Sequence, residues 1–190
     1  MSTIDQARMS ARQRILVVAS DLFYREGINS VGVDQIVRAA HATRATLYRH
    51  FQGKEALVVA YLEREDDGFR ALVESGSQVA ETPRAALELA LEGIADDARR
   101  HHTRGCPFIN ATAEFPDPDS AVRLVVTAHR AWFRSQLEML LAAAGVADPV
   151  EVGEGLVMLR DAVLIGSYLD DPDRARQAFL RNARRLVGTA

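Results

Sequence analysis

The chain has 190 residues, of which 48% are apolar and 26% charged, and this composition excludes a chain that is mainly disordered. Its longest apolar stretch, Met139–Ala147, is too short to span a bilayer, and the polar N-terminus lacks the apolar core of a secretory signal. The single cysteine, Cys106, excludes an intrachain disulfide framework. We therefore expect a cytoplasmic protein with no membrane partner.

The charge is unevenly distributed along the chain. Residues 1–55 carry eight basic and five acidic side chains, a net charge of +3, whereas the remaining residues carry a net charge of −6. Such asymmetry favours a basic contact surface in the first segment of an otherwise acidic protein.

Apolar residues recur at helical spacing along the chain, and no segment alternates in the manner of a strand. A first helix ends at Gly27, and its apolar stripe consists of Ile15, Leu16, Ala19, Leu22 and Phe23. Two short helices are expected over Val33–Ala40 and Arg44–His50, and a long helix from Lys54 into the 70s.

Prolines and glycines mark the helix boundaries in the rest of the chain. Helices are expected to begin near residues 83, 118, 149 and 172, where a capping residue precedes a proline: Thr82-Pro83, Asp117-Pro118, Asp148-Pro149 and Asp171-Pro172. Gly105 and Gly145 predict helix ends, with a short element over 107–114. The helix after Pro118 has an apolar face that includes Leu124, Ala128, Ala131, Leu137 and Leu141. The sequence therefore predicts an all-α protein of about nine helices.

Residues 33–51 have the layout of a helix-turn-helix unit, whose second short helix enters the major groove of DNA. The turn His41-Ala42-Thr43 joins the two helices, and Thr43 is a suitable N-cap for the second. Leu47 and Phe51 are spaced to anchor that helix in the core. The side chains left to face outward are Arg44, Ala45, Thr46, Tyr48, Arg49 and His50.

The run from Thr46 to Leu57, TLYRHFQGKEAL, resembles the T-L-Y-x-H-F-x-x-K-x-x-L signature of TetR-type transcriptional regulators. It follows the helix Asp34–Ala40 at the family's spacing, and the motif covers about a quarter of the chain. Two positions depart from the pattern, His41 in place of the usual glycine and Gly32 in place of a Ser or Thr cap. The resemblance implies an N-terminal three-helix DNA-binding domain over residues 1–53 and a helical ligand-binding and dimerisation domain over residues 54–190.

The resemblance further implies a ligand-responsive repressor that a small molecule releases from a palindromic operator. Tyr48, His50 and Lys54 match positions that commonly contact phosphate, while an arginine can pair with guanine and a threonine methyl can touch thymine. Taken singly, Tyr48 fits a packed aromatic residue and His50 a surface cap, but the whole motif favours DNA contact. The predicted DNA-binding residues are Thr43, Arg44, Thr46, Tyr48, Arg49, His50 and Lys54.

The remaining polar residues do not predict a catalytic or metal site, and no cofactor is expected. No paired ligand spacing links the candidate ligands His101, His102, Cys106, Glu114 and His129. The two adjacent histidines are expected to offset the negative end of the helix before Gly105. Cys106 is expected to be a buried thiol, with redox sensing as the alternative.

The segment from Gly105 to Glu114 shows a looser resemblance to a stretch near the ligand cavity of many TetR-type regulators. It predicts a small-molecule site in an apolar cavity with a few polar groups, lined by Phe108, Asn110, Glu114, His129, Trp132 and Phe133. Ordinary core packing is the alternative for these residues.

The last two helices, about 149–169 and 172–187, carry small residues that allow helices to approach closely. In the family this pair joins the same pair of a second chain, so the resemblance implies a homodimer through about 149–187, as reading two half-sites requires.

Two other classes of function stay open at this point. An all-α enzyme that uses Cys106 or the histidines lacks a nucleophile–base motif. A helical scaffold without DNA function leaves the outward-facing residues of the second short helix unexplained.

Overall fold

The computed structural model describes residues 9–100 and 102–188. Within these residues the chain forms nine helices and no strand, which confirms the predicted all-α class. None of these helices could span a lipid bilayer. Contacts divide the chain into two compact units, the first reaching residue 66 and including 107–126, the second made of 67–106 and 127 onward. This division differs from the boundary predicted between residues 53 and 54, which stays a prediction.

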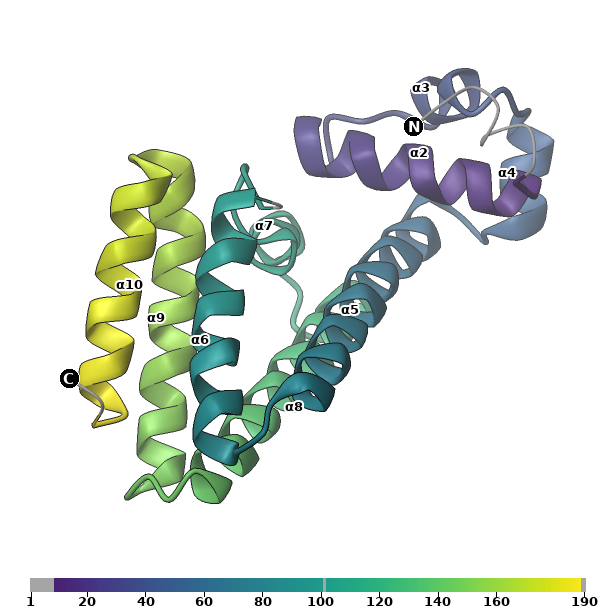
Figure 1. The fold of residues 1–190 in the computed structure, drawn as a ribbon. Helices are drawn as coiled ribbons and strands as arrows, with labels where there is room; N and C mark the ends of the chain where they lie inside the picture. Colours follow the sequence, from purple (N-terminus) through teal and green to yellow (C-terminus); the bar gives the residue numbers. More distant parts are fainter. Residues whose placement is uncertain (1–8, 101, 189–190) are drawn as a thin grey trace. The chain divides into compact units, whose positions relative to one another are not determined.

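The first unit gathers the N-terminal helices (Figure 1). They are α2 (Ala11–Glu26), α3 (Val33–Ala39), α4 (Arg44–His50) and the first half of α5 (Lys54–Val79), joined by α7 (Pro107–Glu114) and the first turns of α8 (Ala121–Ala143).

Helix α2 forms the centre of this unit. It begins with a capping box, in which the backbone N–H of Gln13 donates to Ser10 Oγ at 3.2 Å and that of Ser10 donates to Gln13 Oε1 at 3.0 Å. It ends at Gly27, whose φ of 93° lies where glycine is favoured. Between these ends the predicted apolar stripe is buried except for Leu16, which is half-buried, and the Phe23 ring lies 5.9 Å from that of Tyr61 on α5.

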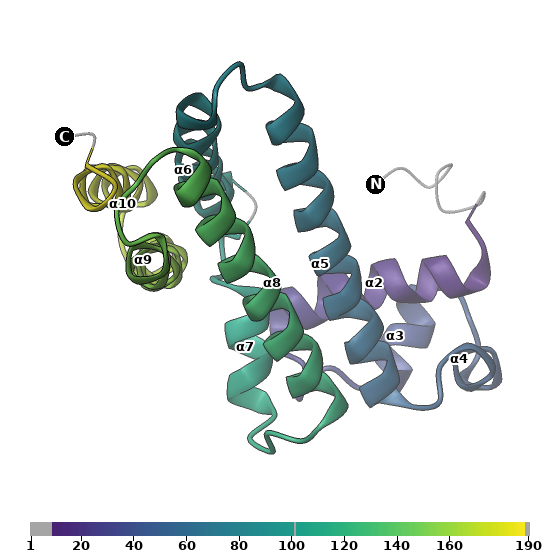
Figure 2. The same cartoon turned by 90° about the horizontal axis from the view of Figure 1, so that it is seen from below.

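The second unit contains three helices that run side by side in Figure 1, α6 (Pro83–Arg100), α9 (Pro149–Leu169) and α10 (Pro172–Leu186). Figure 2 shows α9 and α10 almost end-on beside each other. The rest of α5 and α8 completes the unit. The buried residues of this unit include Leu87, Leu91 and Ala95 of α6, Leu156 of α9 and Phe179 of α10.

Ion pairs join α6 to α10 along the edge of this core. Arg176 Nε lies 2.7 Å from Asp96, Arg184 Nη2 lies 2.7 Å from Glu92, and both arginines have a second acidic partner on α6. Each pair is partly exposed and therefore contributes only modestly to stability. Their regular spacing along both helices nevertheless fixes the register of α10 on α6.

One of the four predicted helix starts needs correction, and so does the predicted capping bond at another. Helix α8 begins at Ala121 and not near 118, because Asp117 Oδ1 accepts the N–H of Asp119 in a turn and Ser120 Oγ accepts the N–H of Arg123. Asp148 precedes α9 as predicted but has a φ of 51° and its side chain makes no cap hydrogen bond. The caps at Thr82 and Asp171 are confirmed, since they accept the N–H groups of Ala85 and Arg174.

The predicted apolar face of α8 is buried only in its C-terminal half. Leu137 and Leu141 are buried, but Leu124, Ala128 and Ala131 are exposed, and the buried residues of the first turns are Val122, Val126, His129 and Phe133. Apolar residues occupy much of the circumference of this helix, so helical spacing alone could not select the inward face.

Candidate nucleic-acid interface

The turn between α3 and α4 is determined by local chemistry. His41, which stands where the family usually has glycine, adopts a left-handed backbone with φ 48°, a region that histidine tolerates better than most residues. Ala42 donates its N–H to the carbonyl of Val37 at 2.9 Å. Thr43 is the predicted N-cap, and its Oγ1 accepts the N–H of Thr46 at 3.1 Å.

Helix α4 is anchored on one face and exposed on the other. Leu47 is fully buried, Phe51 is nearly so, and the Arg12 guanidinium carbon lies 5.2 Å from the centre of the Phe51 ring. Both predicted anchors are therefore confirmed. The exposed side chains are Arg44, Ala45, Tyr48, Arg49 and His50, with Thr46 half-buried.

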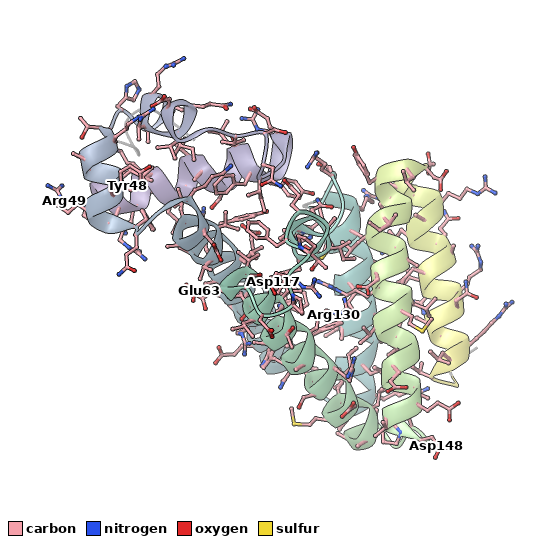
Figure 3. The ribbon with its side chains drawn as sticks, turned by 180° about the vertical axis from the view of Figure 1, so that it is seen from behind. Tyr48, Arg49, Glu63, Asp117, Arg130 and Asp148 are labelled. Carbon is pink, nitrogen blue, oxygen red and sulfur yellow. The ribbon has the colours of Figure 1, made fainter. Side chains whose placement is uncertain are left out.

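Tyr48 is the one large aromatic side chain among the outward-facing residues of α4. It is 53% exposed, so the alternative of a packed aromatic residue does not describe it. Figure 3 shows Tyr48 and Arg49 on the same short helix, with Arg49 extended away from the ribbon. A donor and a cation thus lie on one solvent-facing surface.

Arg44 is already paired in the free protein. Its Nε and Nη2 atoms donate to the two carboxylate oxygens of Asp34 on α3, and both side chains are more than half exposed. The hydrogen bond from Arg44 lowers the pKa of Asp34, and the same bond raises the pKa of Arg44. Because a guanidinium carries five N–H groups, three remain for another partner.

Lys54 is the first residue of α5 and is half-buried. Burial lowers its pKa, and the charge of Glu114 acts in the opposite direction. The positive end of the α5 dipole adds to the charge of this side chain, which suits the position to an anion such as phosphate.

Glu114, predicted as a ligand-binding residue, has a structural partner within the first unit. Its Oε1 accepts the N–H of Ile28 at 2.8 Å and its Oε2 accepts that of Asn29 at 2.5 Å. The carboxylate thereby joins the end of α7 to the loop between α2 and α3. Phe108 is buried on the same helix and Asn110 is half-buried; their predicted contact with a ligand stays a prediction.

Three other predicted ligand residues, all on α8, come together in the second unit around Phe69, which could not be singled out from the sequence. The Phe69 ring centre lies 5.6 Å from that of His129, 6.0 Å from Trp132 and 5.5 Å from Phe133. A phenylalanine in a long amphipathic helix gives no local signal of this role.

A buried arginine was also missed. Arg160 of α9 is 3% exposed, and its guanidinium carbon lies 5.6 Å from the Phe69 ring centre and 5.0 Å from that of Phe133. Its Nη1 lies 3.9 Å from the sulfur of Cys106, which is buried as predicted. The adjacent charged residues Arg160 and Asp161 within the apolar run GLVMLRDAVLIG were the sequence signal that could have indicated it.

The possible metal ligands do not converge. Among the residues that the structure describes, no three His, Cys, Asp or Glu side chains are grouped so that they could hold a metal ion. His102 Nδ1 lies 2.7 Å from Oδ2 of Asp97 in the last turn of α6, and its expected role at the helix end stays a prediction. His101 lies outside the described residues.

Comparison with known proteins identifies this helix arrangement. The family model described as bacterial regulatory proteins, tetR family, matches residues 15–61. The structure of a TetR-family transcriptional regulator from Streptomyces coelicolor is 42% identical, covers 94% of both chains and superposes with a TM-score of 0.90. The reduced form of NemR from Escherichia coli shares the fold, with a TM-score of 0.81 at 17% identity.

Curated relatives match over shorter segments. An uncharacterized HTH-type transcriptional regulator of Mycobacterium tuberculosis is 47% identical over 55 residues, which are 29% of this chain and 27% of that protein. The HTH-type transcriptional activator FasR of Mycolicibacterium smegmatis is 28% identical over 119 residues, or 63% of this chain and 54% of FasR. The chain thus spans about half or less of these relatives' length. With its helix-turn-helix geometry and its likeness to the Streptomyces coelicolor regulator over nearly the whole chain, the protein belongs to the TetR family of DNA-binding transcriptional regulators, which are not enzymes.

Proposed function

We propose that the protein is a homodimeric repressor that binds a palindromic operator and leaves it when a small molecule binds. The observation that carries the proposal is the outward face of α4, because a helix anchored by Leu47 presents Tyr48, Arg49 and His50 away from the core. In a helix-turn-helix protein this helix lies in the major groove. Contacts to base edges there determine the sequence specificity, and contacts to phosphates fix the position of the protein on the duplex.

Each DNA-facing residue has a proposed role. Arg44, Thr46 and Arg49 meet base edges or phosphates, whereas Thr43, Tyr48, His50 and Lys54 position the helix. Arg44 either exchanges Asp34 for DNA or uses the N–H groups that Asp34 leaves free. Asp34 therefore competes with DNA for the same guanidinium.

The proposed dimer joins α9 and α10 of two chains. Met158 is 73% exposed and Leu169 is 69% exposed, and other exposed large apolar residues on these helices are Val150, Tyr168 and Leu186. Apolar side chains gathered on the surface of two neighbouring helices support a protein–protein contact. A twofold dimer would present two copies of α4 to half-sites about 34–36 Å apart, one helical turn of DNA.

The effector is proposed to bind in the second unit, beside the rings around Phe69. Of the predicted ligand residues, His129, Trp132 and Phe133 are retained for this site, whereas Glu114 is assigned to holding the loop that contains Ile28. Helix α5 contains Phe69 and begins with Lys54, so a ligand that displaces α5 also displaces a DNA-facing side chain. The coupling must be reciprocal: a tenfold loss of operator affinity, about 1.4 kcal/mol, requires equally weakened ligand binding to the DNA complex.

Selection of duplexes from a random library with the full chain, followed by footprinting, tests the DNA-binding part. The proposal expects an enriched near-palindrome with two protected half-sites. Failure to enrich any duplex would contradict operator binding, and protection of one isolated half-site would contradict the dimer. Screening compounds for release of the enriched duplex then tests the ligand response.

A further inference from the structure

The second unit contains a cavity of about 450 Å³ between the last turns of α5, the first half of α6 and the end of α8. This volume lies within the range of small-molecule sites in proteins. Of the residues predicted to bind a ligand, only Phe133 lines it, together with Phe69. The cavity is therefore next to the aromatic cluster but extends away from most of the predicted residues.

Among the side chains that the structure describes, the lining contains no charged group. The lining consists mainly of large apolar residues, among them Phe69 and Phe133. Small residues line it on two helices, Ala86, Ala90 and Gly93 on α6 and Gly76 on α5, and Gln136 adds an amide group. The nearby cation Arg160 does not line the cavity, since its guanidinium lies against the rings of Phe69 and Phe133. A charged ligand group buried here would lose water without gaining a partner of opposite charge.

Four large apolar residues of the lining are strongly exposed: Leu72 by 51%, Val79 by 75%, Leu89 by 48% and Met139 by 55%. Exposed apolar side chains around a concavity are typical of a binding groove, because burying them against an apolar ligand is favourable.

Two glycines inside helices keep the cavity open. A Cβ atom added to Gly76 of α5 or to Gly93 of α6 would meet no heavy atom within 4 Å. Close packing therefore does not require glycine at either position, although glycine stabilises a helix less than alanine does. The absence of side chains there enlarges the space between the two helices.

Gln136 is the one polar side chain among the described residues of the lining. It is half-buried, and within the described part of the chain no hydrogen bond engages its amide group. A side-chain amide offers both donor and acceptor groups to a neutral polar group such as a hydroxyl, carbonyl or amide.

We infer that this cavity takes an uncharged ligand with a mainly apolar body and one neutral polar group that pairs with Gln136. The inference rests on the proposed ligand response and specifies the chemical class of the effector. A small molecule fits better than a second chain, because the site is concave and a separate exposed apolar face is present on α9 and α10.

The test uses the full chain and two compounds that differ in charge but share one alkyl length. The neutral fluorophore N-phenyl-1-naphthylamine is bound first, and decanamide or decanoate is then added below its micelle concentration at pH 8. Decanamide should displace the fluorophore, and decanoate should bind at least about tenfold more weakly, because its carboxylate is ionised at this pH. Equal or tighter binding of decanoate would overturn the inference.

Variants locate the binding. Gly76→Leu fills the open space and should weaken fluorophore binding by at least about tenfold, whereas Gly68→Leu, on the same helix and also with open space but outside the lining, should change it less than about twofold. Gln136→Leu should weaken decanamide severalfold and retain the fluorophore. Equal effects of the two glycine variants would overturn the site. Thermal unfolding shows whether each variant is folded. If Gly76→Leu does not fold, Gly93→Leu replaces it, because a leucine at position 93 of α6 fills the same space.

Operator release, measured separately, distinguishes this inference from the proposed function. If decanamide binds the cavity and the operator affinity does not change, the site and its ligand class stand and the proposed response through this site fails. If a charged compound releases the operator from wild type and from Gly76→Leu alike, the response stands and the assigned ligand class is wrong. Sedimentation measures the association of two chains. If the fluorophore no longer binds once the chains associate, a second chain occupies the cavity, which would also overturn the inference.

Discussion

Glu114 is the residue whose replacement tests how α7 is joined to the N-terminal helices. Its carboxylate accepts the N–H groups of Ile28 at 2.8 Å and Asn29 at 2.5 Å, and the Ile28 bond is partly buried whereas the Asn29 bond is exposed. Hydrogen bonds to charged groups contribute about 1.5–3 kcal/mol, and exposure reduces this value, so we assign about 1.5 kcal/mol to the first and about 0.5 kcal/mol to the second. Glu114→Ala should therefore lower the free energy of unfolding by about 2 kcal/mol, and Glu114→Gln, which keeps one acceptor oxygen, by about 1 kcal/mol.

Thermal unfolding followed by circular dichroism measures this loss at one fixed protein concentration, because association makes the midpoint depend on concentration. For a chain of this size, about 2 kcal/mol corresponds to a fall in Tm of about 4–8 °C. Glu63→Ala is the matched control, since Glu63 is an exposed carboxylate on α5 (Figure 3) whose loss should change stability by less than about 0.5 kcal/mol. Equal melting temperatures for Glu114→Ala and Glu63→Ala would refute the assigned role of Glu114.

Lys54→Ala should weaken binding to selected and random duplexes alike and reduce the log–log salt slope by about 0.9 for each phosphate that the lysine neutralises, as anisotropy titrations would show; weaker binding to the selected duplex alone would contradict a phosphate contact. Arg44→Ala should instead relax discrimination at particular base pairs by about 1–3 kcal/mol, measured on duplexes with single base-pair changes. Asp34→Asn releases Arg44 and should tighten DNA binding with little change in the free energy of unfolding, because the ion pair is exposed; unchanged affinity would show that Asp34 does not compete with DNA. In chemical denaturation, Asp171→Ala should cost about 1 kcal/mol through loss of the α10 cap, whereas Asp148→Gly (Figure 3) should cost nothing, because Asp148 makes no cap bond and has a left-handed backbone.

The helix-turn-helix region could be predicted because its structure depends on residues that are close in sequence. Thr43 caps α4 through a residue three positions away, and Leu47 and Phe51 are anchors separated by one helical turn. The positive φ of His41 follows from the same short turn. Local rules of capping and periodicity therefore sufficed for α3 and α4.

The start of α8 shows where local rules fail. Asp117, Pro118 and Ser120 offer two competing starts, and the structure uses Ser120 because Asp117 closes a turn with Asp119. Residue preferences at helix N-termini do not distinguish these two starts, because both place a capping oxygen before a helical turn.

The contacts that define the candidate ligand site, and separately those that Glu114 makes, join residues that are distant in sequence. Arg160 meets the rings of Phe69 and Phe133, and Glu114 meets a backbone segment 85 and 86 positions earlier. Composition and spacing give no information on which helices pack together. The residues on α8 could be proposed from a resemblance, but their common neighbour Phe69 could not.

The claim that α4 carries the DNA contact is tested most directly by the salt dependence of binding for two arginine variants. Arg49 is exposed on α4, and Arg134 is exposed on α8 and serves as the control. If Arg49 meets phosphate, Arg49→Ala should weaken binding to a duplex enriched from random DNA and reduce the log–log salt slope by about 0.9 for each phosphate that the arginine neutralises, or about 1.8 for a dimer. If Arg49 meets guanine, the same variant should relax base discrimination. Arg134→Ala should leave affinity, slope and discrimination as in the wild type. The same affinity, slope and discrimination for both variants would contradict the assignment of α4 as the DNA-contacting helix.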